Sequence, residues 1–215
     1  MMKIAKGGFR TIFYTELCCL LCILGAFFVE NLLRMVFIFF AAALLLLVFL
    51  LFVFFRDPER KTGDGIVAVA DGIIRDIVER HDPDIGDCIL ISTFLNIHNV
   101  HVTRIPLEGT VIDIRYCQGS HIPAFKKESE RNEQMTLLLQ TSIGVLKIVL
   151  IAGTIARRIM VYVQHHDALQ KGQRFGLIKF GSRVDVFLPR DKINVCVQKK
   201  DTVKAGVDKL ADIKG

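Results

Sequence analysis

Cysteine is sparse in this 215-residue chain and follows no disulfide-like pattern. Three of the six cysteines lie within one apolar segment, and Cys88, Cys117 and Cys196 are scattered singly through the rest. This arrangement argues against a small domain held together by disulfides. The Cys19-x-x-Cys22 spacing lacks the second pair that a structural metal site needs, so we expect no metal ion there.

The chain also lacks any run of Lys and Arg interleaved with aromatic residues, which is the pattern of a nucleic-acid-binding surface. Its 28 basic and 22 acidic residues leave a formal net charge of +6. A mildly basic balance of this size suits the anionic surface of a membrane. We therefore expect a lipid bilayer, and no nucleic acid, among the partners.

Long hydrophobic runs are abundant by contrast, and they lie near the N-terminus. Residues 35–55 are 21 uninterrupted apolar positions, which as a helix reach about 31 Å, the thickness of a bilayer core. Residues 11–29 are apolar apart from Glu16 and a few small polar side chains, and a break at residues 30–34 separates the two runs. The pattern predicts a transmembrane helical hairpin that anchors the protein, over residues 1–55. It excludes a fully soluble chain and a disordered one.

Basic residues flank the predicted hairpin on both sides. They are Lys3, Lys6 and Arg10 before it, and Arg56, Arg60 and Lys61 after it. The positive-inside rule then puts both ends, and the domain formed by residues 56–215, on the cytoplasmic face of the cell (inner) membrane. A cleaved signal peptide is the competing interpretation. It fails because the second apolar run is too long for a signal peptide and no small-residue cleavage pattern precedes the domain.

Residues 56–215 have the composition of one globular domain, and their pattern is that of a nearly all-β fold. Short runs rich in β-branched residues alternate with Gly, Pro and Asp. We predict strands over residues 66–70, 73–79, 88–95, 100–105, 110–117, 135–141, 145–151, 155–163, 174–180 and 183–188. Short strands at this spacing, without helices between them, predict a mainly β domain built as an antiparallel barrel or sandwich.

One segment of this domain, QHHDALQKGQRFGLIKFGSRVDVFLP at residues 164–189, resembles the hammerhead-type hairpin of lipoyl and biotinyl carrier domains. The likeness rests on a D-x-L-x-x-G-Q turn that precedes a strand. The segment lacks the lysine that those domains modify at a tight hairpin tip. We therefore look for the chemistry elsewhere.

Gly181 and Ser182 lie between two predicted strands, where a Gly-Ser pair is ordinarily a turn. Their surroundings, FGSRVDVFLP, resemble the C-terminal signature of the short, membrane-bound bacterial-type phosphatidylserine decarboxylase proenzymes. Further segments resemble that family in the same order: FFRDPER at 54–60, VAVADGII at 67–74, FLNIHNVHVTRIPLEGTV at 94–111, SERNEQ at 129–134 and GTIARRIMVYV at 153–163. The resemblance therefore covers almost the whole chain.

The resemblance implies a self-processing enzyme. Members of the family split their own chain before the serine of the Gly-Ser pair and convert that serine into an N-terminal pyruvoyl group, which is their cofactor. In this sequence the scissile bond is Gly181–Ser182, and Ser182 becomes the pyruvoyl group. The two products, residues 1–181 and 182–215, would stay associated in one fold. Glycine suits the position before the serine because it tolerates a strained backbone and leaves its carbonyl unshielded.

The resemblance also implies roles for three further side chains. A serine hydroxyl is a poor nucleophile until a neighbouring base takes its proton. The family implies His101 as this base, with Asp71 orienting it. His98 is the implied donor of the proton that replaces the lost CO2, because histidine titrates near neutral pH.

Plainer interpretations of the same residues follow from spacing alone. His98 and His101 cannot share one face of a regular strand, which argues against a zinc pair. Both are otherwise ordinary histidines near the start of a strand. Asp71 before Gly72 is, by itself, a common turn aspartate. Only the joint pattern raises these residues to candidates for catalysis.

We therefore expect a pyruvoyl-dependent decarboxylase that converts phosphatidylserine into phosphatidylethanolamine and CO2 at a membrane. Two alternatives stay open. One is a membrane-tethered adaptor with a carrier-like β domain and no enzymatic activity, in which Ser182 would stay uncleaved. The other is a decarboxylase of another lipid that carries a serine headgroup, such as an archaeal ether lipid. A homo-oligomer also stays open.

Overall fold

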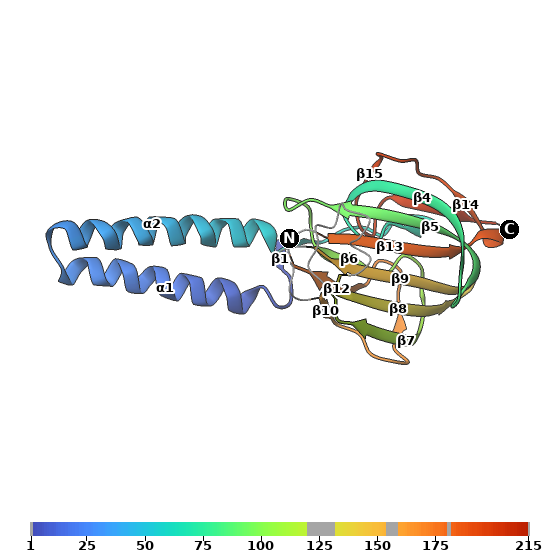
Figure 1. Ribbon diagram of the computed structural model, residues 1–215, viewed down its shortest axis with the longest axis horizontal. Coiled ribbons are helices and arrows are strands. Elements are labelled where there is room, and N and C mark those ends of the chain that lie inside the picture. Colours follow the sequence, from blue (N-terminus) through green and yellow to red (C-terminus); the bar gives the residue numbers. More distant parts are fainter. Residues whose placement is uncertain (1, 120–131, 154–158, 180–181, 215) are drawn as a thin grey trace. The chain divides into compact units, whose positions relative to one another are not determined.

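A computed structural model describes residues 2–119, 132–153, 159–179 and 182–214, with Met2 and Ser182 described by their backbone alone. The chain divides into two compact units, Met1–Glu59 and Arg60–Gly215. The first unit is mainly helical and the second is built from strands (Figure 1). The predicted strand at 155–163 begins outside the described residues, and within its described part the strand is β10, Ile159–Val161.

The first unit is a pair of antiparallel helices, α1 (Phe9–Phe28) and α2 (Asn31–Phe54) (Figure 1). Both are long and apolar enough to cross a membrane, by length and composition. Strand β1 (Met2–Ile4) before α1 pairs with β2 (Arg56–Pro58) after α2. The two ends of the hairpin therefore lie side by side.

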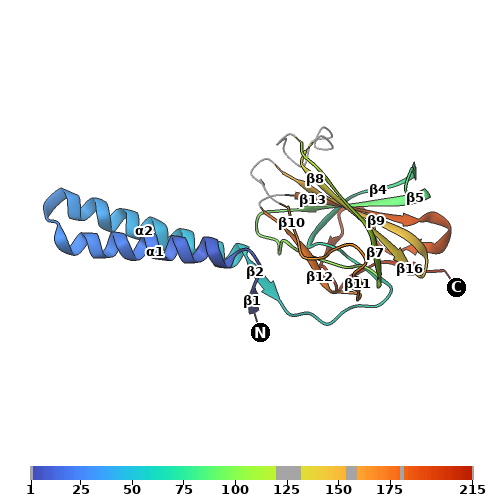
Figure 2. The same cartoon turned by 90° about the horizontal axis from the view of Figure 1, so that it is seen from below.

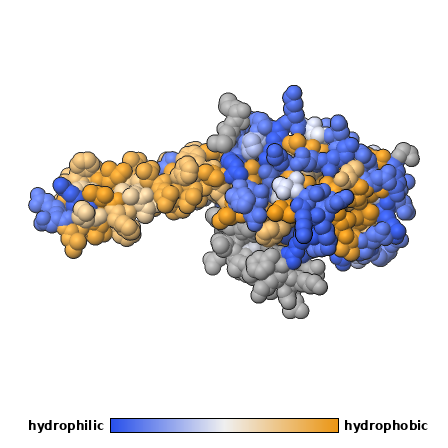
Figure 3. All heavy atoms as spheres, turned by 90° about the horizontal axis from the view of Figure 1, so that it is seen from above, coloured by the Kyte–Doolittle hydropathy of each residue, from blue (hydrophilic) through white to orange (hydrophobic). Residues whose placement is uncertain are grey.

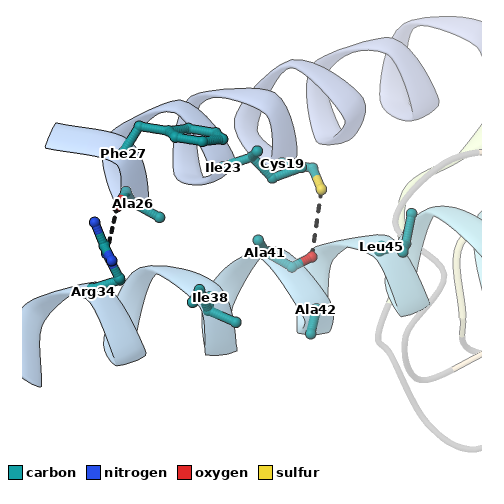
Figure 4. A pocket seen from close by; sticks show the side chains of 9 residues that line it. All are labelled: Cys19, Ile23, Ala26, Phe27, Arg34, Ile38, Ala41, Ala42 and Leu45. Carbon is teal, nitrogen blue, oxygen red and sulfur yellow. Dashed lines mark hydrogen bonds between the residues drawn. The ribbon is translucent and has the colours of Figure 1, made fainter. Parts of the chain in front are cut away.

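The turn of the hairpin is shorter than predicted, since Val29 and Glu30 alone separate the helices and the last four residues of the expected break, 31–34, belong to α2. The reason is Arg34, whose Nε donates to the carbonyl oxygens of Ala26 and Val29, at 3.2 Å each. These carbonyls at the end of α1 have no partner within their own helix. Arg34, in the first turn of α2, provides the hydrogen-bond donor for these carbonyls (Figure 4). This charged residue was expected to lie in the break between the helices, and it belongs to α2.

The two helices touch closely and still leave a groove between them. A Cβ atom on Gly25 would lie 2.6 Å from the Phe37 ring, so a larger residue would require this ring to move. Farther along, the Cys19 thiol donates to the Ala41 carbonyl at 3.4 Å beside a groove of about 480 Å³ (Figure 4). The outward surface of both helices is almost wholly apolar (Figure 3).

The second unit contains an eight-stranded antiparallel sheet and two three-stranded sheets, and the large sheet curls into a half-barrel (Figure 2). The large sheet has the order β11 (Ala168–Leu169), β7 (Gly109–Cys117), β8 (Gln134–Thr141), β9 (Gly144–Ala152), β13 (Ser182–Pro189), β5 (Gly86–Leu95), β4 (Gly72–Asp82) and β15 (Thr202–Val203). The second sheet has the order β10, β12 (Arg174–Ile178) and β6 (Val102–Arg104). The third has the order β14 (Ile193–Val195), β16 (Lys209–Ile213) and β3 (Ile66–Val67), after a 3₁₀ turn at Arg190–Lys192.

The core lies on the inner face of the large sheet, against the two small sheets. Alternation along β13 illustrates how the strands build it, because successive side chains point to opposite faces. Val184, Val186 and Leu188 are buried in the main core cluster, while Phe187 joins a smaller cluster on the outer face. The mainly β, antiparallel fold predicted from the sequence is confirmed.

The predicted hammerhead-type segment does not pair with itself. Strand β12 pairs with β6 and β10, whereas β13 pairs with β5 and β9. The chain therefore passes from one sheet to another between these two strands, and residues 180–181 at the crossing lie outside the described part of the chain.

Ion pairs cover the smaller cluster on the outer face of the large sheet. Lys147 Nζ lies 2.8 Å from both Asp82 and Asp84 and 5.1 Å from the centre of the Phe187 ring. Arg115 approaches Asp84 from the other side, at 2.7 Å. Burial alone would lower the pKa of Lys147, but its two carboxylate partners outweigh burial and raise that pKa. The smaller apolar cluster is thus covered by oppositely charged side chains that form ion pairs with one another.

Replacing Asp84 by Asn should reduce the acid dependence of stability. Hydrogen bonds from Arg115 and Lys147 hold the pKa of Asp84 below its usual value of 3.8. A lowered pKa contributes stability that is complete above the unfolded-state pKa and is lost as the pH falls through the folded-state pKa. We expect Asp84→Asn to lower the free energy of unfolding by about 1–2 kcal/mol near pH 7.

The measurement is calorimetric unfolding of the full chain in detergent as a function of pH. The gap between Asp84→Asn and the wild type should close as the pH falls through the lowered pKa of Asp84, where the wild-type carboxylate also loses its charge. The control is Asp191→Asn, an exposed carboxylate in the 3₁₀ turn, which should track the wild type throughout. A gap of constant size at every pH would contradict the assignment.

Candidate active site

Four strand ends meet at one edge of the large sheet, and this edge carries the predicted site. Strand β13 begins with Ser182, whose backbone pairs with Leu95 at the end of β5 and with Ala152 at the end of β9. Strand β4 begins beside Asp71, and its Ile73 pairs with the residue that precedes Leu95. The topology therefore brings the Asp71 and Ser182 segments to the same edge, although 111 positions separate them in the sequence.

Gly72 permits the close approach of β4 to β5 at this edge. A Cβ atom at this position would lie 2.2 Å from the Phe94 carbonyl oxygen, and a backbone atom of a paired strand cannot move aside. The Asp-Gly pair is thus more than a turn signal. It lets the strand begin immediately after the candidate carboxylate.

The two candidate histidines follow β5 in a connection that leads to β6. The connection is a tight turn, in which the Asn99 N–H donates to the Asn96 carbonyl at 2.9 Å and the Asn96 N–H donates to Asn99 Oδ1 at 2.8 Å. His98 lies on this turn and is exposed. His101 is completely buried, and its carbonyl accepts a hydrogen bond from the Ile178 N–H at 3.2 Å. Both histidines precede β6 and lie outside a strand.

The buried ring of His101 is held in one tautomer. Its Nδ1 atom lies 2.8 Å from the Asn99 carbonyl oxygen, which can only accept, so Nδ1 carries the hydrogen. In the neutral ring the lone pair then belongs to Nε2. This is the arrangement that a general base needs, and Asn99 is a contributor that the sequence motif did not single out.

Asp71 is bound by partners that the sequence did not predict. Its carboxylate accepts two hydrogen bonds from the Arg60 guanidinium and one from the Ala205 N–H. The described hydrogen bonds of Asp71 thus go to Arg60 and Ala205, and the described bond of the His101 ring goes to Asn99. The orienting action of Asp71 on His101 stays a prediction.

The predicted cleavage point is described in part. Gly181 lies outside the described residues, and Ser182 is described as the first residue of β13. The strand that begins there is held on both sides, since each residue from Ser182 to Phe187 pairs with β5 and with β9. Arg183 and Asp185, which share the outer face of β13, form a buried ion pair of 2.5 Å.

Asn132 and Glu133 extend the site edge beyond β9, and both are buried. Asn132 Nδ2 donates to the Ala152 carbonyl at 2.7 Å, and the Ala152 N–H donates to the Glu133 carbonyl at 2.9 Å. Ala152 is the backbone neighbour of Ser182 across the strands. The SERNEQ motif was recognised in the sequence without a role, and these bonds show that its described part fixes the strand next to Ser182.

Comparison with known proteins decides the family. Residues 48–211 match the family model described as phosphatidylserine decarboxylase. The chain belongs to the phosphatidylserine decarboxylase family. The match begins within α2 and includes every predicted site residue, so the resemblance seen in the sequence motifs is confirmed. As a member of the phosphatidylserine decarboxylase family, the protein is a decarboxylase.

Individual relatives in this phosphatidylserine decarboxylase family agree with the match. A "Phosphatidylserine decarboxylase proenzyme" of Syntrophus aciditrophicus is 44% identical over 165 residues, covering 73% of this chain and 76% of that protein. A protein of the same name from Streptomyces griseus is 42% identical over 158 residues, covering 73% of this chain and 71% of that protein. A "Putative archaetidylserine decarboxylase proenzyme" of Methanosarcina mazei is also 42% identical, over 168 residues, covering 77% and 76%.

Proposed function

We propose that the protein is a self-processing, pyruvoyl-dependent enzyme that decarboxylates phosphatidylserine to phosphatidylethanolamine. The observation that carries the proposal is the position of Ser182. It is the first residue of a strand clamped between two others, and this strand begins at the edge from which the His98–His101 connection leaves β5. Relatives named as proenzymes support a maturation step.

The position of Ser182 is compatible with a pyruvoyl group. Such a group must stand at a chain end, and an end created at Ser182 would leave the pairing of residues 183–187 with β5 and β9 in place. The Arg183–Asp185 pair lies within the same strand and would stay intact as well. Residues 182–215 would therefore remain part of the sheet after cleavage, and the two chains would stay associated.

Maturation begins with His101 as general base. His101 Nε2 takes the hydroxyl proton of Ser182, whose oxygen attacks the Gly181 carbonyl carbon, and the peptide C–N bond breaks as an ester forms. Loss of the Ser182 α-proton then expels the Gly181 carboxylate and leaves dehydroalanine. The dehydroalanine tautomerises to an imine, which one water molecule hydrolyses to a pyruvoyl group and ammonia. The Gly181–Ser182 peptide bond and one water molecule are thus converted into a Gly181 carboxylate, a pyruvoyl group and ammonia. Asp71 supports His101 as it acquires positive charge.

In catalysis the pyruvoyl group supplies a carbonyl that accepts the electron pair released as CO2 leaves. The chain's own residues supply the proton that takes the place of the carboxylate. His98 is the proposed donor, because it is exposed on the turn and three residues from the buried base. The two hydrogen bonds between Asn96 and Asn99 stabilise the conformation of this turn.

The helix pair fits an enzyme whose substrate is a membrane lipid. Its two ends emerge together through the β1–β2 pairing, and both ends carry basic residues. We propose that it anchors the protein in the cell (inner) membrane with the second unit on the cytoplasmic face. A two-chain lipid is nearly insoluble, so its headgroup must be met at the membrane surface.

The test is an assay of the full chain, purified in detergent and added to vesicles that contain phosphatidylserine. The expected result is release of one CO2 for each phosphatidylethanolamine formed. Parallel vesicles containing archaetidylserine test the lipid backbone, because relatives named for each of the two lipids reach at least 42% identity with this chain. Turnover of archaetidylserine alone would redirect the substrate assignment, and turnover of neither lipid would favour the tethered adaptor.

A further inference from the structure

A closed ring of hydrogen bonds holds the Asp71 carboxylate at the edge of the large sheet. Arg60 Nη1 donates to Oδ1 at 2.5 Å and Nη2 donates to Oδ2 at 2.8 Å. The Ala205 N–H also donates to Oδ1, at 2.8 Å. Arg60 Nη1 further reaches the Ala205 carbonyl at 3.0 Å. Each of the three residues therefore contacts the other two.

The ring is shielded from water and joins distant parts of the second unit. The side chains of Arg60 and Asp71 are only 12% and 11% exposed to solvent. A two-pronged guanidinium–carboxylate contact in such a place fixes the plane of the carboxylate as well as its position. Ala205 comes from the segment after Ser182, so the ring would link the two chains that maturation produces.

The ring leaves one hydrogen-bond acceptor position of the Asp71 carboxylate unoccupied. A carboxylate has about four lone-pair positions, two on each oxygen. The two donors on Oδ1 occupy both of its positions, and the single donor on Oδ2 occupies one. The remaining position is on Oδ2, so any further hydrogen bond to Asp71 must be received there.

We propose that Arg60 is a positioning residue for maturation, which fixes the Asp71 carboxylate so that its negative charge stabilises the protonated form of His101. Arg60 itself touches neither reacting atom and acts through Asp71. The inference rests on the proposed function, because it assumes that Asp71 assists His101. It assigns a role to the last residue of the FFRDPER motif.

The test is a double-mutant cycle on the rate at which newly made full-length chain splits, followed by pulse-chase synthesis in the presence of membranes. We expect Asp71→Asn to slow splitting about 100- to 10,000-fold and Arg60→Gln to slow it about 10- to 100-fold. The double variant should split no more slowly than Asp71→Asn alone, because Arg60 has no other route to the reaction. Arg60→Lys, which keeps the charge and loses the two-pronged contact, should fall between Arg60→Gln and the wild type.

The matched control is Arg190→Gln, which removes an exposed ion pair with Glu79 of 3.0 Å and should split at the wild-type rate. If the slowing of splitting in the double variant equals the product of the slowing in Arg60→Gln and in Asp71→Asn, the inference is overturned. An arginine that only stabilises the fold would lower the splitting rate independently of Asp71. If Arg60→Gln does not fold, Arg60→Lys takes its place in the cycle with the same criterion.

The outcomes also separate this inference from the proposed function. A wild-type chain that never splits would overturn the proposed function and this inference with it. A wild-type chain that splits, is slowed by Asp71→Asn and is unaffected by Arg60→Gln would overturn the role of Arg60 alone.

Discussion

Ser182→Ala should leave the protein as a single chain without decarboxylase activity. Alanine has the backbone of serine but no hydroxyl, so it can neither attack the Gly181 carbonyl nor become a pyruvoyl group. We expect activity on phosphatidylserine vesicles to fall by roughly 10,000-fold or more, to the background of the assay. The measurement combines a denaturing gel of the purified protein with CO2 release.

The fold should tolerate this change, because Ser182 contributes to β13 through its backbone pairs with Leu95 and Ala152. The unfolding temperature of Ser182→Ala should therefore stay close to that of the wild type. Ser142→Ala, in the exposed turn between β8 and β9, is the matched control and should mature and react normally. A Ser182→Ala protein that still releases CO2 would refute the assignment of the pyruvoyl group to this residue.

His101→Gln should slow chain splitting about 100- to 10,000-fold, the usual contribution of a general base. Glutamine has roughly the length of histidine and can keep a hydrogen bond to the Asn99 carbonyl, which the ring now holds at 2.8 Å. It has no basic nitrogen to take the Ser182 proton. The rate is measured on newly synthesised chain, as a time course of the intact and split forms.

The matched control for His101→Gln is His165→Gln, which replaces an exposed histidine on the turn before β11. This control should split at the wild-type rate. A second comparison is His98→Gln, which should mature normally and then show reduced turnover, because His98 is the proposed proton donor of the catalytic step. A His101→Gln chain that splits as fast as the wild type would mean that another group takes the serine proton.

Much of the fold was predictable from the sequence because the elements have strong local signals. The 21-residue apolar run at residues 35–55 falls almost entirely within α2, and alternation along the β13 segment predicted that strand to within a residue at each end. The C-terminal strands β14 and β16 were missed, because they are only three and five residues long and have little pattern of their own. Their stability comes from pairing with each other and with β3.

The candidate site was predictable only as a set of motifs, since its contacts join residues far apart in the chain. The motifs containing Asp71, His98, His101 and Ser182 were recognised, but the partners of Asp71 depend on a contact with Ala205, 134 residues away. The role of Arg60 was likewise hidden, because the FFRDPER motif gives no sign of which charge its last arginine meets. The crossing of the chain between β12 and β13 is a matter of strand pairing, which residue patterns do not specify.

The most direct test of self-processing is the intact mass of the purified wild-type protein under denaturing conditions. The account predicts two chains, residues 1–181 and 182–215, in place of one species of 24.2 kDa. The smaller chain should resist Edman degradation and react with a carbonyl reagent, because it begins with a pyruvoyl group. A single unbroken chain in a preparation that releases CO2 from phosphatidylserine would contradict the pyruvoyl mechanism.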